Sequence, residues 1–179
     1  MNYAQKEYEI EMFQIGDLLF YGTNGVCRVS EICSSPFDSA DTRSFYKLTP
    51  ISDHSSLVIY TPVDNVQVVM RPLISKEEAE ALLSRLSAIE KVAVAIEKHR
   101  KEAYRETIRE GAPEGFVSII KTVRARRELF RKTRRRIPDL DNDFEYTAKQ
   151  CLYGELSAVL GIAREEIHRI VSEGIAEAQ

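Results

Sequence analysis

The chain has few of the features that mark secreted or membrane proteins. It contains three cysteines, Cys27, Cys33 and Cys151, an odd number without paired spacing. We therefore expect reduced thiols, two in strands and one in a helix, rather than a disulfide framework. The N-terminal segment is polar and acidic, unlike a signal peptide, and the apolar runs are far too short to span a bilayer. A cytoplasmic protein without a membrane segment is the expectation.

Motifs for catalysis or metal binding are also missing. The three histidines, His54, His99 and His168, lie in no HExxH pattern and have no cysteine partner at ligand spacing. No glycine-rich loop leads into a Lys-Ser or Lys-Thr pair, so no phosphate-cradling loop is expected. The acidic cluster at residues 139–143 resembles part of a calcium loop but lacks its glycine and its final glutamate, and helix capping is the preferred interpretation. We expect no enzyme, no cofactor and no metal.

The first 72 residues predict short strands separated by turns. Period-two patterning indicates five of them: Leu18–Tyr21, Val26–Cys33, Phe45–Leu48, Leu57–Thr61 and Val66–Met70. The segment Gly22–Gly25 fits the GxxG loop of an RNA-binding KH domain, but that loop joins helices, whereas this one joins strands. Its Asn-Gly pair favours positive φ at both central positions of a tight hairpin turn. Five short strands in about 60 residues predict a small barrel of the SH3 or Tudor type.

After Pro72 the hydrophobic period changes from two to about 3.6 residues, which predicts helices. Ser75 and Glu78 have capping-box spacing, and the helix that they begin is expected to continue to the stop at residues 111–113. A second helix is expected to end at Ile137-Pro138.

A third helix should run from the acidic turn at residues 139–143 to Leu160, with Gly161 as its C-terminal stop, and a short helix should follow at residues 163–172. The predicted fold class is thus α+β. A five-stranded Tudor/SH3-like barrel (residues 12–72) precedes an all-α bundle of about four helices (residues 73–179).

Positive charge is concentrated in one segment. Residues 121–136 hold nine basic side chains opposed only by Glu128, in a chain of net charge −3. Residues 1–72 carry net −4, residues 73–138 net +7 and residues 139–179 net −6. A local reversal of sign indicates an anionic partner, and phosphate contacts are a natural source of such binding. The alternative is a solvated face with internal ion pairs.

A helical projection divides the basic run. Its apolar stripe, expected to pack on the bundle, consists of Phe116, Ile119, Ile120, Val123, Phe130 and Ile137. One exposed flank is predicted to hold Lys121, Arg124, Arg131, Lys132 and Arg135. Arg127 and Arg134 lie nearer the stripe, where they are expected to snorkel or to pair with acids of neighbouring helices.

The order and spacing of several motifs resemble the CarD/CdnL family of bacterial transcription regulators. The resemblance covers residues 12–173 and is carried by FQIGDLLFY and NGV at residues 13–26, YKL at 46–48, LVIYTPVDN at 57–65 and VMRPLIS at 69–75. RKEAYRE at 100–106 with Gly111, and YGELSAVLGI at 153–162, are similar to the linker helix and the C-terminal segment of the family.

The resemblance implies an adaptor that joins RNA polymerase to promoter DNA and shifts open-complex stability. Its Tudor-like module would bind the β subunit of RNA polymerase by strand addition at an exposed edge, through Val58, Ile59, Tyr60, Thr61 and Pro62. Alternation along the strand means that about half of these residues belong to the barrel core. The family's DNA contacts map onto Arg124 and Arg126, with Lys121, Arg127, Arg131, Lys132 and Arg135 nearby. The expected state is a monomer.

The chain departs from the family in ways that bear on its DNA contact. Family members commonly carry a tryptophan wedge near the start of the helical domain, and this chain has no tryptophan. Tyr60 replaces an arginine found on the polymerase-facing strand of some members. The main alternative function is binding of structured RNA by a barrel with a basic helix, as in ribosome-associated factors.

Overall fold

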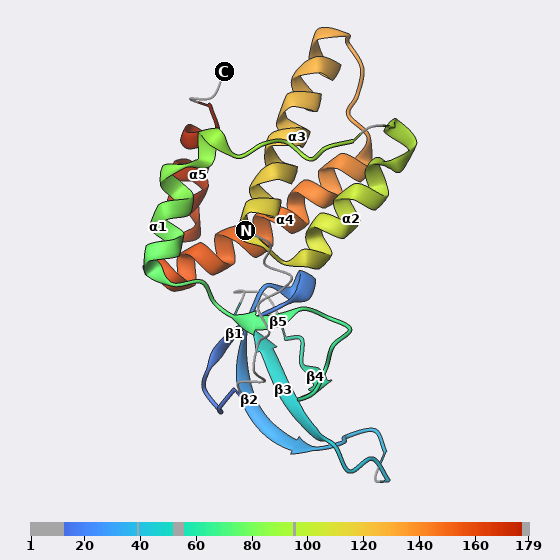
Figure 1. The fold of residues 1–179 in the computed structure, drawn as a ribbon, viewed down its shortest axis with the longest axis vertical. Coiled ribbons are helices and arrows are strands. Elements are labelled where there is room, and N and C mark those ends of the chain that lie inside the picture. The colour runs from blue at the N-terminus through green and yellow to red at the C-terminus, as the bar shows by residue number, and fades with distance from the viewer. Residues whose placement is uncertain (1–12, 39, 52–55, 95, 177–179) are drawn as a thin grey trace. The chain divides into compact units, whose positions relative to one another are not determined.

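The structure, a computed structural model, describes residues 13–38, 40–51, 56–94 and 96–176. The chain divides into two compact units between Leu73 and Ile74 (Figure 1). The first is a five-stranded antiparallel sheet and the second is helical, so the predicted α+β class is confirmed. His54 and residue 12, the start of the predicted barrel, lie outside the described residues. Within the described ranges, no helix is long and apolar enough to cross a bilayer.

The strands of the N-terminal unit are antiparallel to their neighbours, in the order β4-β3-β2-β1-β5. Their bounds are Leu18–Tyr21 (β1), Val26–Ser34 (β2), Ser44–Pro50 (β3), Ile59–Pro62 (β4) and Met70–Pro72 (β5). Three of the strands, β1, β2 and β3, supply the buried core cluster, while Ile59 of β4 and Met70 of β5 pack against it. Every strand therefore contributes to one core.

The turn between β1 and β2 differs from the predicted Asn-Gly turn. Antiparallel pairing of β1 with β2 confirms the hairpin. Positive φ occurs at Gly22 (47°), the first residue of a 3₁₀ turn of residues 22–24, and at Gly25 (67°), which follows that turn, but not at Asn24. A Cβ on Gly22 would lie 2.6 Å from Cγ1 of Val68, so this position requires glycine for space as well as for backbone conformation.

The fifth strand begins later than predicted. Val66 is 94% exposed and precedes β5, which starts at Met70. The side chain of Asn65 explains the shift. It accepts from the N–H of Gln67 (3.0 Å) and donates to the carbonyl of Val68 (2.9 Å), which holds this segment in a turn.

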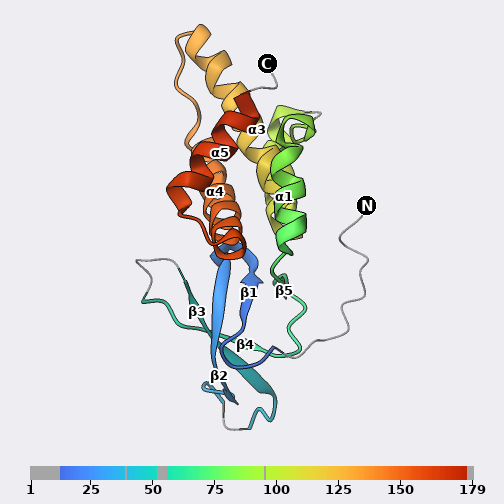
Figure 2. The ribbon, with the colours of Figure 1, turned by 90° about the vertical axis from the view of Figure 1, so that its left-hand side faces the viewer.

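The described part of the helical unit contains five α-helices rather than about four. Figure 2 shows them in a view turned by 90° from that of Figure 1. They are Lys76–Ser84 (α1), Arg100–Glu110 (α2), Pro113–Lys132 (α3), Asp139–Leu160 (α4) and Arg164–Ala176 (α5). The capping box of Ser75 and Glu78 begins α1 as predicted, and Gly161, with φ of 70°, ends α4 as predicted. The extra helix arises because the first predicted helix is two helices, α1 and α2, with an irregular segment between them.

Lys121 of α3 is the physical reason for this interruption. Its ammonium donates to the backbone carbonyls of Leu86 (3.0 Å), Ser87 (2.8 Å) and Ile89. In a continuous helix these carbonyls would accept from N–H groups four residues later. The Lys121 side chain therefore binds a bend in the chain, and the residue is only 8% exposed. Its predicted place on the exposed flank is wrong.

Helix α3 also ends earlier than expected, at Lys132 instead of near Ile137. Thr133 Oγ1 donates to the carbonyl of Leu129 (3.0 Å), and Arg134 adopts a left-handed φ of 54°. The backbone N–H of Arg135 turns back to the carbonyl of Phe130 (2.8 Å). These contacts close the C-terminal end of the helix, so the last three arginines of the basic run lie in a turn.

Replacing Lys121 by methionine should destabilise the helical unit. Methionine retains most of the aliphatic stem but leaves the three carbonyls without the ammonium, a loss of about 3 kcal/mol in the free energy of unfolding. Lys132→Met, at an exposed position of the same helix, is the matched control and should leave stability unchanged. Urea unfolding of both variants checks this, and equal stabilities would show that the ammonium does not hold the bend.

Candidate functional site

Among the described residues, strand β4 lies at one edge of the N-terminal sheet, where it pairs with β3 alone. The N–H of Val63 donates to the carbonyl of Ser44 (2.9 Å), and the register pairs Thr61 with Tyr46 and Tyr60 with Lys47. Because hydrogen-bonded and non-hydrogen-bonded pairs alternate between antiparallel strands, the backbone N–H and C=O of Tyr60 point away from β3. The edge therefore offers hydrogen-bonding groups to an added strand.

The five residues predicted on this edge separate by side-chain direction. Thr61 is 2% exposed, and Ile59 packs on the core, so both serve the fold. Val58 is exposed and Tyr60 is partly exposed, while Pro62 is half-buried. Alternation thus leaves Val58 and Tyr60 as the side chains that a partner could contact.

An exposed aromatic pair lies beside the same edge. The rings of Phe37 and Tyr60 meet edge to face, with centroids 5.8 Å apart, and Phe37 is 76% exposed. On neighbouring strands, Lys47 forms a 3.1 Å ion pair with Glu31. An aromatic pair open to solvent next to unpaired backbone groups has the composition of a protein-binding surface.

In the helical unit, a buried carboxylate holds part of the basic run. Asp141, in the first turn of α4, has no exposed surface. Nε of Arg100 lies 3.0 Å from Oδ1 of Asp141, in an ion pair that lacks hydrogen-bond geometry. Nε of Arg126 lies 3.3 Å from the same oxygen. The hydroxyl of Tyr104 donates to the same carboxylate (3.1 Å), and burial followed by this charge raises the pKa of Tyr104. A buried charge needs such compensation.

The partners of Asp141 extend to Glu97, which accepts from Arg126 at 2.7 and 3.1 Å and also pairs with Arg100. Arg126 was one of the two residues to which the resemblance assigned DNA contact. The structure places its guanidinium between two carboxylates and near the ring of Phe130, so most of its hydrogen-bonding capacity serves the bundle.

Arg124 and Arg127 contact neighbouring helices as well. Nη1 of Arg124 donates to the carbonyl of Ser172 in α5 (3.0 Å). Arg127 pairs with Glu145 of α4, which confirms its predicted pairing with an acid of another helix. Burial raises the pKa of the Glu145 carboxyl, but hydrogen bonds from Arg127 and Lys149 more than reverse this, and its pKa lies below the ordinary value. Glu145 is therefore ionised at neutral pH.

The remaining cations gather at the C-terminal end of α3 and in the turn that follows. They are Arg131, Lys132, Arg134 and Arg135, all exposed and, among the described residues, without an acidic partner. Arg135 contacts the ring of Phe130, while Arg136 pairs with Asp139. In both ribbon views the end of α3 projects beyond the other helices of its unit (Figures 1 and 2). Such an end can approach a polyanion without steric interference from its own bundle.

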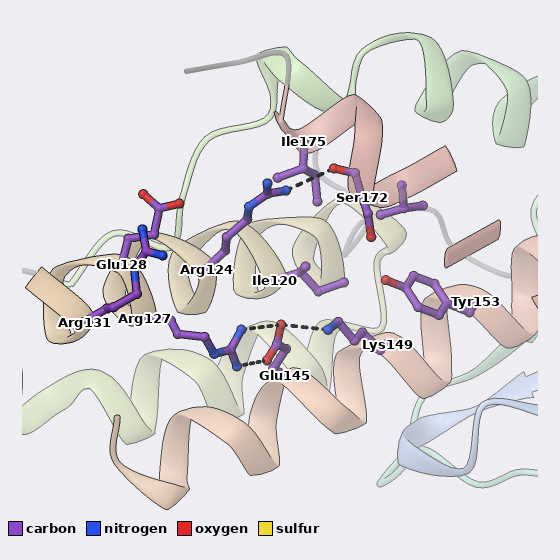
Figure 3. A pocket seen from close by; sticks show the side chains of 11 residues that line it. Ile120, Arg124, Arg127, Glu128, Arg131, Glu145, Lys149, Tyr153, Ser172 and Ile175 are labelled. Atoms are coloured by element: carbon purple, nitrogen blue, oxygen red, sulfur yellow. Dashed lines mark hydrogen bonds and ion pairs between the residues drawn. The ribbon is translucent and has the colours of Figure 1, made fainter. Parts of the chain in front are cut away.

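A cavity of about 440 Å³ lies among α3, α4 and α5 (Figure 3). It brings together Arg124, Arg127 and Arg131, three members of the predicted DNA-binding set, with Lys149 and Tyr153 of α4. Burial, followed by the charge of Glu145, raises the pKa of Tyr153 to about 12, so its hydroxyl is neutral at physiological pH.

Some residues of these sites carried no clear signal in the sequence. Arg100 and Lys101 are adjacent basic residues, and the sequence does not indicate that Arg100 is buried. Arg134 was expected near the apolar stripe, which is wrong because the helix ends before it. Lys149 and Tyr153 lie outside the basic run, and only the packing of α4 on α3 brings them to it. Within the described part of the chain, no group of histidine, cysteine or acidic side chains could hold a metal ion.

Residues 13–74 match the family model described as the CarD-like/TRCF RID domain. The resemblance to CarD-like regulators is therefore confirmed for the N-terminal unit, and it supports an RNA polymerase-interacting transcription factor. This domain family is regulatory and non-enzymatic. A comparison with curated proteins gave no match.

Asp141→Asn should destabilise the helical unit strongly. The amide leaves Arg100 and Arg126 without the buried negative charge that they compensate, at a cost of about 3–5 kcal/mol in the free energy of unfolding. Asp143→Asn, an exposed change in the same turns of α4, is the control and should have little effect. Chemical denaturation monitored by circular dichroism measures both. A small effect for Asp141→Asn would mean that the arginines are held by Glu97 instead.

Proposed function

We propose that this protein regulates bacterial transcription initiation by binding the β subunit of RNA polymerase through its N-terminal domain and promoter DNA through its helical unit. Binding both would shift the stability of the open complex. The observation that supports this most is the match of residues 13–74 to a polymerase-interacting domain. In the same chain, the end of α3 and the segment after it present four exposed cations that have no acidic partner among the described residues.

The proposed polymerase contact is strand addition at β4. The outward backbone groups of Tyr60 would supply hydrogen bonds, and the side chains of Val58, Tyr60 and Phe37 would supply apolar contact. Main-chain hydrogen bonding gives such a contact affinity, and the side chains give it specificity. Ile59 and Thr61 would contribute to this contact only indirectly, by stabilising the strand, because they face the core.

The proposed DNA contact uses the cations that the bundle leaves exposed. Arg131, Lys132, Arg134 and Arg135 would neutralise phosphates, with Arg124 and Arg127 contributing the parts of their guanidinium groups that neighbouring helices do not occupy. Lys121 and Arg126 act in holding the bundle together. Phosphate contacts position a protein on DNA without reading its sequence.

Binding to DNA alone should accordingly be weak and nonspecific, with a Kd of about 10⁻⁴ to 10⁻⁶ M at physiological salt. Attachment to polymerase raises the local concentration of the helical unit at the promoter, which makes a weak contact effective. The missing tryptophan is consistent with a contact that depends on charge.

Tyr60→Asp in the full-length chain should reduce binding to the isolated β subunit by at least about tenfold, because a carboxylate replaces an aromatic ring in the centre of the proposed interface. Val66→Asp is the matched control. Val66 is a more exposed residue of the same unit, in the turn after β4, and its substitution should leave binding unchanged. Size-exclusion co-elution and surface plasmon resonance measure the effect. Failure of the unaltered protein to bind the β subunit would refute the polymerase contact.

Lys132→Gln with Arg135→Gln should weaken binding to promoter-fork DNA and leave β-subunit binding intact. A plot of the logarithm of the association constant against the logarithm of the salt concentration should have a slope smaller in magnitude by about 2, because two phosphate contacts are lost. Arg105→Gln with Arg109→Gln, two exposed arginines of α2 that pair with glutamates, is the control. Fluorescence anisotropy across salt concentrations checks this. A clear preference for transfer RNA at matched salt, without polymerase binding, would favour the RNA-binding alternative.

A further inference from the structure

The cavity between α3, α4 and α5 has a strongly asymmetric lining. Its charged side chains are four cations, Arg124, Arg127, Arg131 and Lys149, and two carboxylates, Glu128 and Glu145, which leaves a formal excess of two positive charges. Arg127 and Lys149 share Glu145, as Figure 3 shows, so a single carboxylate opposes both. Arg131 has no acidic partner among the described residues.

Tyr153 supplies a second, independent indication of a ligand. The residue is only 8% exposed, and its buried hydroxyl meets the geometric criteria of a hydrogen bond with no group of the described chain, although the Ser172 side chain lies near enough to lower its pKa. In Figure 3 the hydroxyl end of the ring points toward Lys149 and Ile120, into the space enclosed by the labelled side chains. Buried hydroxyls are normally hydrogen-bonded, so this one is placed to donate to a bound molecule.

The rest of the lining is apolar. Ile120 of α3 and Val171 and Ile175 of α5 are buried and lie beside the cations. Ligand cavities typically combine such apolar walls with a few convergent polar groups, and a volume of about 440 Å³ is in the usual range for a small organic ligand. Arginine guanidinium groups bind phosphate by paired hydrogen bonds.

We propose that this cavity binds a small organic phosphate. The phosphate dianion, which matches the excess charge of two, would lie between Arg124 and Lys149 and accept from the hydroxyl of Tyr153, beside which Lys149 lies in Figure 3. The organic part would lie against Ile120, Val171 and Ile175. Arg124 would keep its hydrogen bond to Ser172, which already directs its side chain across the gap between α3 and α5.

This site goes beyond the proposed polymerase and DNA contacts and does not depend on them. It shares Arg131 with the proposed DNA surface, whereas Lys132 and Arg135 lie outside the cavity lining and Tyr153 lies inside it. Ligand binding by the full-length chain without DNA or polymerase therefore tests the cavity alone. Failure of DNA binding in the Lys132→Gln with Arg135→Gln variant would leave this proposal unaffected.

The test is isothermal titration calorimetry of the full-length protein with adenosine monophosphate, adenosine and inorganic phosphate at constant ionic strength. The experiment is done near pH 7.5, above the second phosphate pKa of about 6. We expect saturable 1:1 binding of adenosine monophosphate. Adenosine lacks the phosphate and inorganic phosphate lacks the organic part, so each should bind at least about tenfold more weakly.

Variants locate the binding to the cavity. Arg124→Gln should weaken binding of adenosine monophosphate about tenfold and Tyr153→Phe about three- to tenfold, since each removes a donor to the phosphate. Arg169→Gln, an exposed arginine of α5 outside the cavity, should bind like the unaltered protein. Without ligand, Tyr153→Phe should have an unchanged or higher Tm, because it removes an unpaired buried hydroxyl.

Three results would overturn the proposal. One is the absence of saturable binding of adenosine monophosphate at millimolar concentration. Another is equal affinity for inorganic phosphate, which would indicate general attraction of anions. The third is binding that neither Arg124→Gln nor Tyr153→Phe weakens. A clearly lower Tm of Tyr153→Phe would also count against it, since the hydroxyl would then have a structural partner.

Discussion

The helical unit depends on the burial of one carboxylate, that of Asp141. A buried charge without partners is costly, and this one is compensated by Arg100 from α2, Arg126 from α3 and the hydroxyl of Tyr104. The contact joins three helices at one point, and Glu97 extends it to the irregular segment before α2. It therefore decides both how the helices pack and which arginine of the basic run is not available to a partner.

The basic run also changes along its length from side chains that contact the bundle to side chains that are exposed. Lys121, near the middle of α3, binds backbone carbonyls, and Arg124, Arg126 and Arg127 contact neighbouring helices. Only beyond Phe130 do the cations extend clear of the bundle. The run thus combines internal pairing in its first part with exposed cations in its last, where Arg131, Lys132, Arg134 and Arg135 have no acidic partner among the described residues. The cavity lies where the two meet, with Arg124 and Arg131 on its α3 side.

The N-terminal unit shows how far period-two patterning can predict the strands of a small sheet. Four of the five strands were predicted at or close to their observed positions, and the sequence motifs of residues 13–74 match a polymerase-interacting domain. The alternation of core-facing and outward side chains along β4 follows from the period of two. Only the register shows that the backbone N–H and C=O of Tyr60 point away from β3. The late start of β5 escaped prediction because the hydrogen bonds of Asn65 override the strand propensity of three valines.

The sequence by itself determined the α+β class, the capping box of α1, the glycine stop of α4, the alternation of side chains along β4 and the concentration of positive charge. These features depend on local periodicity, on backbone preferences and on composition, which neighbouring residues specify. Tertiary structure alone decided that Lys121 is buried, that α1 and α2 are separate helices, and that Tyr153 and Lys149 join arginines of α3 around a cavity. Each outcome depends on contacts between elements that are distant in the sequence, and the free energy of these contacts exceeds the local preference for a continuous helix and an exposed lysine.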